Sequence, residues 1–173
     1  MACVSSQSDE AVKLSLNSEY MKSLLLFILW IPVTGALVFL AQAPAEDPQQ
    51  IEETILQLFE GMRESDREKA ADVFHDTMTL STVVNRDGSV ELAQTDMEVF
   101  LNAVGQPKDQ VWDEQISGLQ VHIDGDLATA WMNYSFSRGE TFSHCGVNTM
   151  NLIRTADGWK IFSITDTRRT DNC

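Results

Sequence analysis

Residues 141–167 read TFSHCGVNTMNLIRTADGWKIFSITDT and give the clearest structural signal in the chain. Asp157-Gly158 is typical of a tight hairpin turn, because Gly adopts the positive φ angles that such turns require. The flanking segments, 141–155 and 159–167, are rich in β-branched and aromatic residues, as strands are. The sequence therefore predicts a long antiparallel hairpin near the C-terminus.

Two more strands are predicted before this hairpin. We expect 111–123 and 127–137 to pair through a turn at Asp124-Gly125. Along 127–137 apolar side chains alternate with polar ones, so every second residue faces the same side of the sheet. The more apolar side is expected to be concave, and it carries Ala130, Met132, Tyr134 and Phe136.

The pairing register of the sheet depends on the turn at 137–140. A turn with an odd number of residues places Tyr134 opposite His144. A slip of one residue would bring Cys145 to that position instead. Both registers remain open at this point.

The last strand, 159–167, has two expected faces because strand side chains alternate. One face carries Phe162, Ile164 and Asp166, followed by Arg168. Aromatic residues are enriched in interface cores, so an aromatic patch on the other sheet face favours a homodimer through the sheet. This outer patch is predicted to consist of Trp131, Trp159 and Ile161.

Two helices are expected before the sheet. Asp47 and Pro48 fit the N-cap and the first helical position, and apolar residues then recur at helical spacing over 51–62. Ser65 and Glu68 fit a capping box that opens a second helix. We expect that helix to end at His75-Asp76.

A strand at 78–84 and a returning strand at 89–93 are predicted next, joined by turn residues. Thr95 and Glu98 fit a further capping box, which opens a third helix. The element order is therefore α-α-β-β-α-β-β-β-β. This order predicts an α+β fold with the helices packed on one face of a curved antiparallel sheet.

The first 45 residues are interpreted as an export signal preceded by an extension. Met21-Lys22 gives a positive start, 24–41 is mainly apolar, and Ala43-Pro44-Ala45 fits a cleavage pattern. We expect cleavage after Ala45 and a periplasmic or secreted domain at 46–173. An uncleaved signal would instead anchor the chain in a membrane. Residues 1–20 are interpreted as an over-extended N-terminus ahead of a true start at Met21.

Composition restricts the partners of the domain. Of the 26 acidic and 12 basic residues in the chain, 23 and 10 lie in 46–173. So acidic a domain repels phosphate backbones, and we expect no nucleic-acid partner. Cys145 and Cys173 either form a disulfide, which an exported location permits and which we favour, or remain separate thiols.

The three histidines, His75, His122 and His144, stand apart in the sequence without a paired His or Cys motif. We therefore expect no metal and no cofactor. The absence of a G-x-S-x-G motif argues against a serine hydrolase. Proton transfer is the enzymatic chemistry that remains, with Asp76 or His144 as the candidate general base beside an apolar pocket.

The element order and the closing Asp157-Gly158-Trp159-Lys160-Ile161 resemble the nuclear transport factor 2-like superfamily. Within it, the chain is most similar to small bacterial proteins described as SnoaL-like or putative lumazine-binding. Segments 142–146 and 166–169 resemble the exported branch of that group, and the resemblance covers about 49–169. It implies a cystatin-like cone, in which a curved sheet wraps around the helices and leaves a pocket at its wide end.

Members of that superfamily include enzymes, binding domains and dimerising domains, so the fold leaves the function open. We prefer an exported domain that binds a small hydrophobic or aromatic ligand without catalysis. The alternatives are an isomerase-, dehydratase- or cyclase-type enzyme and a ligand-free dimerisation module. The predicted pocket residues are His75, Phe100, Met132, Tyr134, Phe136, His144, Asp166 and Arg168.

Overall fold

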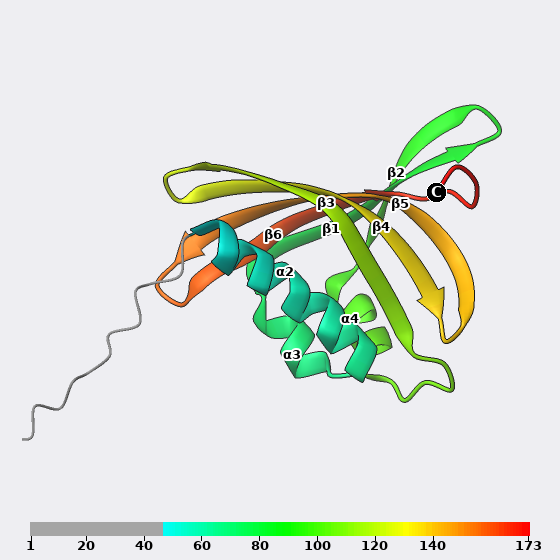
Figure 1. The fold of residues 1–173 in the computed structure, drawn as a ribbon, viewed down its shortest axis with the longest axis horizontal. Coiled ribbons are helices and arrows are strands. Elements are labelled where there is room, and N and C mark those ends of the chain that lie inside the picture. Colours follow the sequence, from blue (N-terminus) through cyan, green and yellow to red (C-terminus); the bar gives the residue numbers. More distant parts are fainter. Residues whose placement is uncertain (1–46) are drawn as a thin grey trace, which may run out of the picture. The chain divides into compact units, whose positions relative to one another are not determined.

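The computed structural model describes residues 47–173 (Figure 1). The export signal, its cleavage after Ala45 and the start at Met21 lie outside the described residues and stay predictions. Within 47–173, no helix has both the length and the apolar character needed to cross a membrane.

The described residues form three helices and six strands, in the element order that the sequence predicts. The helices are α2 (Asp47–Glu64), α3 (Arg67–Asp72) and α4 (Met97–Gly105). The strands are β1 (Phe74–Arg86), β2 (Ser89–Thr95), β3 (Trp112–Asp124), β4 (Leu127–Arg138), β5 (Thr141–Thr155) and β6 (Gly158–Thr167). The α+β class is confirmed.

All six strands belong to one sheet with the order β2-β1-β6-β5-β4-β3. Neighbouring strands are antiparallel except β1 and β6, which run parallel because the chain returns from the far edge of the sheet to its start. Figure 1 shows that the sheet is strongly curved and that α2, α3 and α4 all lie on one of its faces. The helices and the inner face of the sheet enclose the core.

Helix α2 is held to the sheet by its apolar stripe. Ile51 and Ile55 are fully buried, and Leu58, Phe59 and Met62 are nearly so. They belong to one core cluster with sheet residues of β4, β5 and β6. Each such side chain contributes about 1.5–3 kcal/mol through burial, so this stripe fixes where α2 crosses the sheet.

The two shorter helices are capped one residue later than the capping boxes predict. Asp66, not Ser65, accepts the hydrogen bond from the Lys69 backbone N–H at 2.9 Å, and Asp96, not Thr95, accepts from Val99 at 3.0 Å. An N-cap residue needs an extended backbone. Ser65 instead has a φ of 59° in the turn that closes α2, so it cannot serve as the cap.

Helix α3 ends at Asp72, earlier than predicted, and His75-Asp76 belongs to strand β1. The Ile161 backbone N–H donates a hydrogen bond of 2.8 Å to the Val73 carbonyl, and Phe74 pairs with Ile161. Pairing with β6 therefore draws the chain into the sheet directly after Val73. The predicted helix end was wrong because this pairing is long-range.

The structure pairs Tyr134 with neither His144 nor Cys145, the two partners that the sequence left open. Arg138 pairs with Thr141 across a two-residue turn, in which Gly139 has a φ of 57°. A register shift then makes Phe136 the partner of His144, while Tyr134 pairs with Gly146. An even-numbered turn followed by a bulge thus gives Tyr134 a partner that neither alternative included.

A second bulge changes which side chains of β6 face the core. Leu152 pairs with Ile161 and its neighbour Asn151 with Ser163, which leaves Phe162 as the extra residue. Trp159 and Ile161 therefore lie in the core with 3% and 0% exposure, on the same side as Ile164 and Asp166. The predicted outer patch is wrong in composition, because of its three members only Trp131 is exposed.

The structure contains a disulfide between Cys145 and Cys173, whose Cα atoms are 5.8 Å apart. Cys145 also forms a bridge with Arg169 through two backbone hydrogen bonds. These contacts hold the C-terminal tail against β5, next to the residues described below.

Candidate functional site

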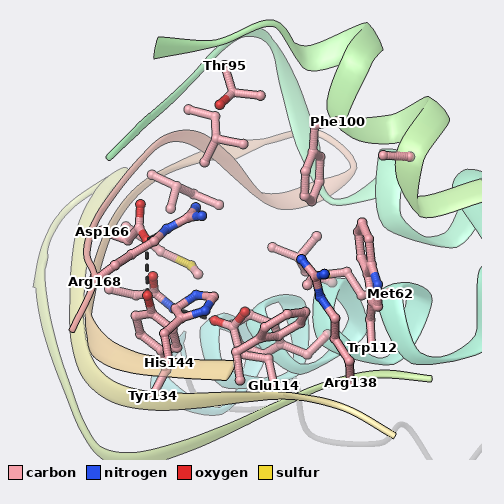
Figure 2. Close-up of a pocket in the computed structure, with 18 of the residues that line it drawn as sticks. Met62, Thr95, Phe100, Trp112, Glu114, Tyr134, Arg138, His144, Asp166 and Arg168 are labelled. Atoms are coloured by element: carbon pink, nitrogen blue, oxygen red, sulfur yellow. Dashed lines mark hydrogen bonds and ion pairs between the residues drawn. The ribbon is translucent and has the colours of Figure 1, made fainter. Parts of the chain in front are cut away.

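A cavity of about 300 Å³ lies between the concave face of the sheet and helices α2 and α4 (Figure 2). Its helical wall is apolar. Three residues come from α2 and three from α4: Leu58, Phe59, Met62, Val99, Phe100 and Ala103.

The sheet supplies nearly all the polar groups of the cavity. They come from the concave positions of neighbouring strands and from the residue that follows β6, because alternate strand residues face the helices. These side chains are Glu114, Arg138, Tyr134, His144, Asn148, Asp166 and Arg168. The cavity is thus apolar on one side and hydrogen-bonding on the other.

Asp166 is the most heavily bonded of these groups and is only 6% exposed. Thr82 donates to its Oδ1 at 2.5 Å, and Arg168 Nε donates to its Oδ2 at 2.8 Å. The Tyr134 hydroxyl lies 3.1 Å from the same Oδ2. A buried carboxylate is tolerated only with such partners, so this cluster forms a fixed part of the cavity wall.

Tyr134 acts as a donor in this cluster. Its hydroxyl lies 3.1 Å from Asp166 and 2.9 Å from the Thr167 carbonyl, and its single proton serves one of these acceptors at a time. Burial, and then the nearby charge of Asp166, raise the pKa of Tyr134 well above its usual value. Tyr134 therefore stays protonated throughout the physiological pH range.

Glu114 is the titratable group that sequence reasoning missed. It is half-buried on β3, and Asn148 Nδ2 donates to its Oε1 at 2.7 Å. Burial raises the pKa of Glu114 to about 7, the Asp166 charge adds to the shift, and Asn148 and Arg168 oppose it. A carboxyl group that is partly protonated near neutral pH can donate, accept or transfer a proton.

A local signal for Glu114 was present in the sequence. Glu114 alternates with Trp112 and Ile116, which are the apolar positions of that strand. A carboxylate on the apolar side of a strand faces the core, where it needs a special environment. The strand prediction for 111–123 alone assigns no role to Glu114.

His144 lies beside Tyr134 and Phe136 on the cavity wall. The ring centroids are 5.7 Å from Tyr134 and 5.2 Å from Phe136, and the Ser143 Oγ is 3.0 Å from Nδ1. Burial lowers the pKa of His144, as do the charges of Arg168 and Arg138, against the opposing effect of Asp166. His144 is therefore a neutral hydrogen-bonding group at pH 7.

Six of the eight predicted pocket residues line this cavity and two do not. Met132 is fully buried in the core, and His75 lies on β1 with its Nδ1 2.9 Å from the Thr77 hydroxyl. Asp76 is exposed and does not line the cavity, so the arrangement offers His144 and Glu114 as titratable groups in its place. Whether any of these residues binds or reacts stays a prediction.

No group of three or more His, Cys, Asp or Glu side chains within 47–173 is arranged to hold a metal ion. The chemistry that the described cavity can perform with its own residues is hydrogen bonding, ion pairing and proton transfer.

The fold places this chain in the structural class of the cystatin-like, NTF2-like proteins, that is, the nuclear transport factor 2-like fold. Within that class, the chain belongs to the family described as "Putative lumazine-binding", whose sequence model matches residues 46–165. The family that the sequence resembles is thereby confirmed. No match was found among curated proteins.

Several solved structures are similar to this chain. A cystatin-like protein of unknown function from Nostoc punctiforme is 12% identical with a TM-score of 0.58, over 73% of this chain and 94% of that chain. A putative dehydratase of the NTF2-like family from Streptomyces avermitilis is 19% identical with a TM-score of 0.56, over 74% and 99%. A putative scytalone dehydratase from Novosphingobium aromaticivorans is 12% identical with a TM-score of 0.58, over 71% and 84%. At these identities the likeness shows a shared fold alone.

Proposed function

We propose that the cavity binds a small organic ligand of one or two rings, with its polar edge turned to the sheet. The observation that carries this proposal is the division of one cavity of about 300 Å³ into an apolar helical wall and a polar sheet wall. Ligand sites in proteins are mostly apolar, carry a few placed polar groups, and begin at roughly this volume. The description of the family also supports a small-molecule ligand.

The wall residues suit a flat ligand. Phe100 from α4 and Trp112 from β3 provide aromatic surface on the side of the cavity away from Asp166 (Figure 2). Tyr134 and Asp166 are held by their own hydrogen bonds, so they define a rigid polar boundary. Glu114 and His144 can exchange hydrogen bonds with a ligand edge, because each can act as a donor or an acceptor.

The test is a binding screen with lumazine, 2-naphthol and a steroid, measured by thermal shift and then by calorimetry. Ala103→Phe places a ring into the cavity and is expected to abolish binding of any hit. Asn102→Phe adds the same ring at an exposed position of the same helix and is expected to leave binding unchanged. Equal binding by both variants would contradict the proposal.

A second candidate function is proton transfer, and the observation that favours it is the Glu114 pKa of about 7 inside the cavity. General bases work best when their pKa lies near the operating pH. The probe is 2-tetralone, whose α-hydrogens exchange with D₂O and are counted by NMR. Catalysed exchange that is lost in Glu114→Gln supports an enzyme, and exchange at the buffer rate in the unaltered protein contradicts it.

We also propose that the protein is exported, on the strength of the signal pattern at 21–45 and of the Cys145–Cys173 disulfide. Sequencing of the N-terminus of the exported protein is expected to begin at Glu46, and a cytosolic protein that begins upstream of Met21 would contradict the proposal.

A homodimer through the outer sheet face stays a proposal that rests on Trp131, which is 50% exposed. Trp131→Ser is expected to lower the sedimenting mass, and a monomeric unaltered protein would contradict it.

A further inference from the structure

Arg138 is a positive charge without a protein partner. It lies at the end of β4 and lines the mouth of the cavity. Figure 2 shows its side chain pointing into the cavity between Trp112 and Glu114. Within residues 47–173, the Arg138 side chain takes part in no hydrogen bond and no ion pair.

This isolation is unusual among the basic residues of the described domain. The other nine basic side chains each reach at least one acceptor, which is an acidic side chain or a backbone carbonyl. They are Arg63, Arg67, Lys69, Arg86, Lys108, Arg154, Lys160, Arg168 and Arg169. Acidic residues greatly outnumber basic ones, yet none pairs with Arg138, whose exposed side chain stays open to solvent at the cavity mouth.

Arg168 adds a second positive charge to the same cavity. Its Nε is bonded to Asp166, and its terminal amino groups point into the cavity in Figure 2. The charges of both Arg168 and Arg138 lower the pKa of His144, which lies on the wall that Tyr134 and Phe136 share. Both guanidinium groups therefore border the same open cavity.

The carboxyl groups of the cavity have hydrogen-bond partners other than Arg138. Asp166 is occupied by Thr82, Tyr134 and Arg168. Glu114 accepts from Asn148, and its raised pKa leaves it partly neutral at pH 7. The cavity thus combines two arginines with one carboxyl group that already has three partners and a second that is partly neutral at pH 7.

We propose that the ligand is an organic anion, a carboxylate carried on one or two rings, whose carboxylate pairs with Arg138. Guanidinium and carboxylate groups match through two parallel hydrogen bonds, which a neutral amide cannot reproduce. The rings lie against Phe100 and Met62 on the helical wall. This inference rests on the proposed function, because it requires that the cavity takes a ligand.

The experiment compares 2-naphthoate with 2-naphthamide, which share shape but differ in charge, by calorimetry at pH 6.5. We expect naphthoate to bind about tenfold more tightly, the effect of one charge-assisted pair. In Arg138→Gln this preference is expected to fall below about twofold while naphthamide affinity is unchanged. Arg138→Lys keeps the charge without the fork and is expected to retain part of the preference.

Arg86→Gln is the matched control, because Arg86 is exposed on the β1–β2 hairpin and does not line the cavity. It is expected to preserve the full preference. Equal affinity of the two probes for the unaltered protein, or a preference that survives Arg138→Gln, overturns the anion inference and leaves the proposed function standing. Failure of both probes to bind contradicts the proposed function together with this inference.

Discussion

The side-chain amide of Asn148 on β5 donates a hydrogen bond of 2.7 Å to the carboxyl group of Glu114 on β3, across the intervening strand β4. The reach is possible because the sheet curves around the cavity and brings the two strands closer on its concave side (Figure 1). The bond fixes one oxygen of Glu114. Protonation of Glu114 changes the net charge of the cavity near pH 7.

Glu114 is expected to make stability depend on pH. Its folded-state pKa of about 7 lies above the ordinary value of 4.5. Its contribution to the free energy of unfolding is therefore fully present below pH 4.5 and is lost as the pH rises through 7. Urea denaturation of Glu114→Gln, which keeps the oxygen that accepts from Asn148, should show a gain of ~1–3 kcal/mol relative to the unaltered protein between pH 4.5 and 8.

Glu140→Gln serves as the control for that comparison, because Glu140 is an exposed turn residue. Its difference from the unaltered protein is expected to stay within about 0.5 kcal/mol across the same range. A Glu114→Gln difference that is flat with pH would contradict the assigned pKa.

Anion affinity is expected to fall as the pH rises. Naphthoate meets an additional negative charge when Glu114 loses its proton, so its affinity should decrease by about tenfold from pH 6 to 8. Asp166 and Arg168 face Glu114 across the cavity, and Glu60 and Arg63 of α2 border its other side.

The pH dependence of naphthoate affinity should disappear in Glu114→Gln. If another group caused it, the dependence would remain in this variant. Burial, and then the charges of Arg168 and Arg138, lower the pKa of His144, which reduces its contribution to this dependence. Calorimetry in two buffers of different ionisation enthalpy measures the accompanying proton uptake, and no uptake at pH 7 would contradict the linkage.

Gly146 is expected to tolerate no side chain. A Cβ atom there would lie 1.8 Å from the Thr167 carbonyl oxygen and 2.8 Å from Cε1 of Tyr134. Gly146→Ala must therefore displace backbone and should cost more than about 2 kcal/mol in unfolding free energy. Gly88→Ala is a suitable comparison, since it has open space but a φ of 89°. A Gly146→Ala cost no larger than that of Gly88→Ala would contradict the tight contact under Tyr134.

The disulfide is expected to stabilise the domain because it closes a loop in the unfolded chain and so lowers the entropy of the unfolded state. Cys145 and Cys173 are 28 residues apart in sequence. Closing a loop of that length contributes about 3.5 kcal/mol in the chain-entropy account. Cys173→Ser should lower the urea midpoint accordingly, and reduction with dithiothreitol should lower that of the unaltered protein but not of the variant. Equal urea midpoints of the unaltered protein with and without dithiothreitol would argue that the two thiols are not paired in solution.

The turns could be predicted from the sequence because their signals are local. Asp124-Gly125 and Asp157-Gly158 specify hairpins through residues that favour tight turns. The bulges at Phe162 and after Phe136 could not be predicted, since a bulge depends on how two strands fit over the core. The Phe162 bulge moved Trp159 from the predicted outer face into the core.

The candidate site was predicted in part for the same reason. Tyr134 and Phe136 follow from simple alternation along β4, and the structure places both on the cavity wall. Two partners of Asp166, Thr82 and Tyr134, come from β1 and β4, so no local pattern indicates them, whereas its third partner, Arg168, lies two residues further along the chain. The sequence could not predict that Arg138 lacks a partner, because this is known only once the partners of the other basic residues are known.

The most direct test of the cavity as a ligand site is a methyl NMR titration of the purified protein with 2-naphthoate. Met62, Met150 and Ile164 report on three walls of the cavity, and Ile153 reports on the exposed surface. Shifts at the three cavity methyls that saturate together, with Ile153 unchanged, are the predicted result. No shift at the cavity methyls at millimolar ligand, or shifts at Ile153 alone, would contradict the account.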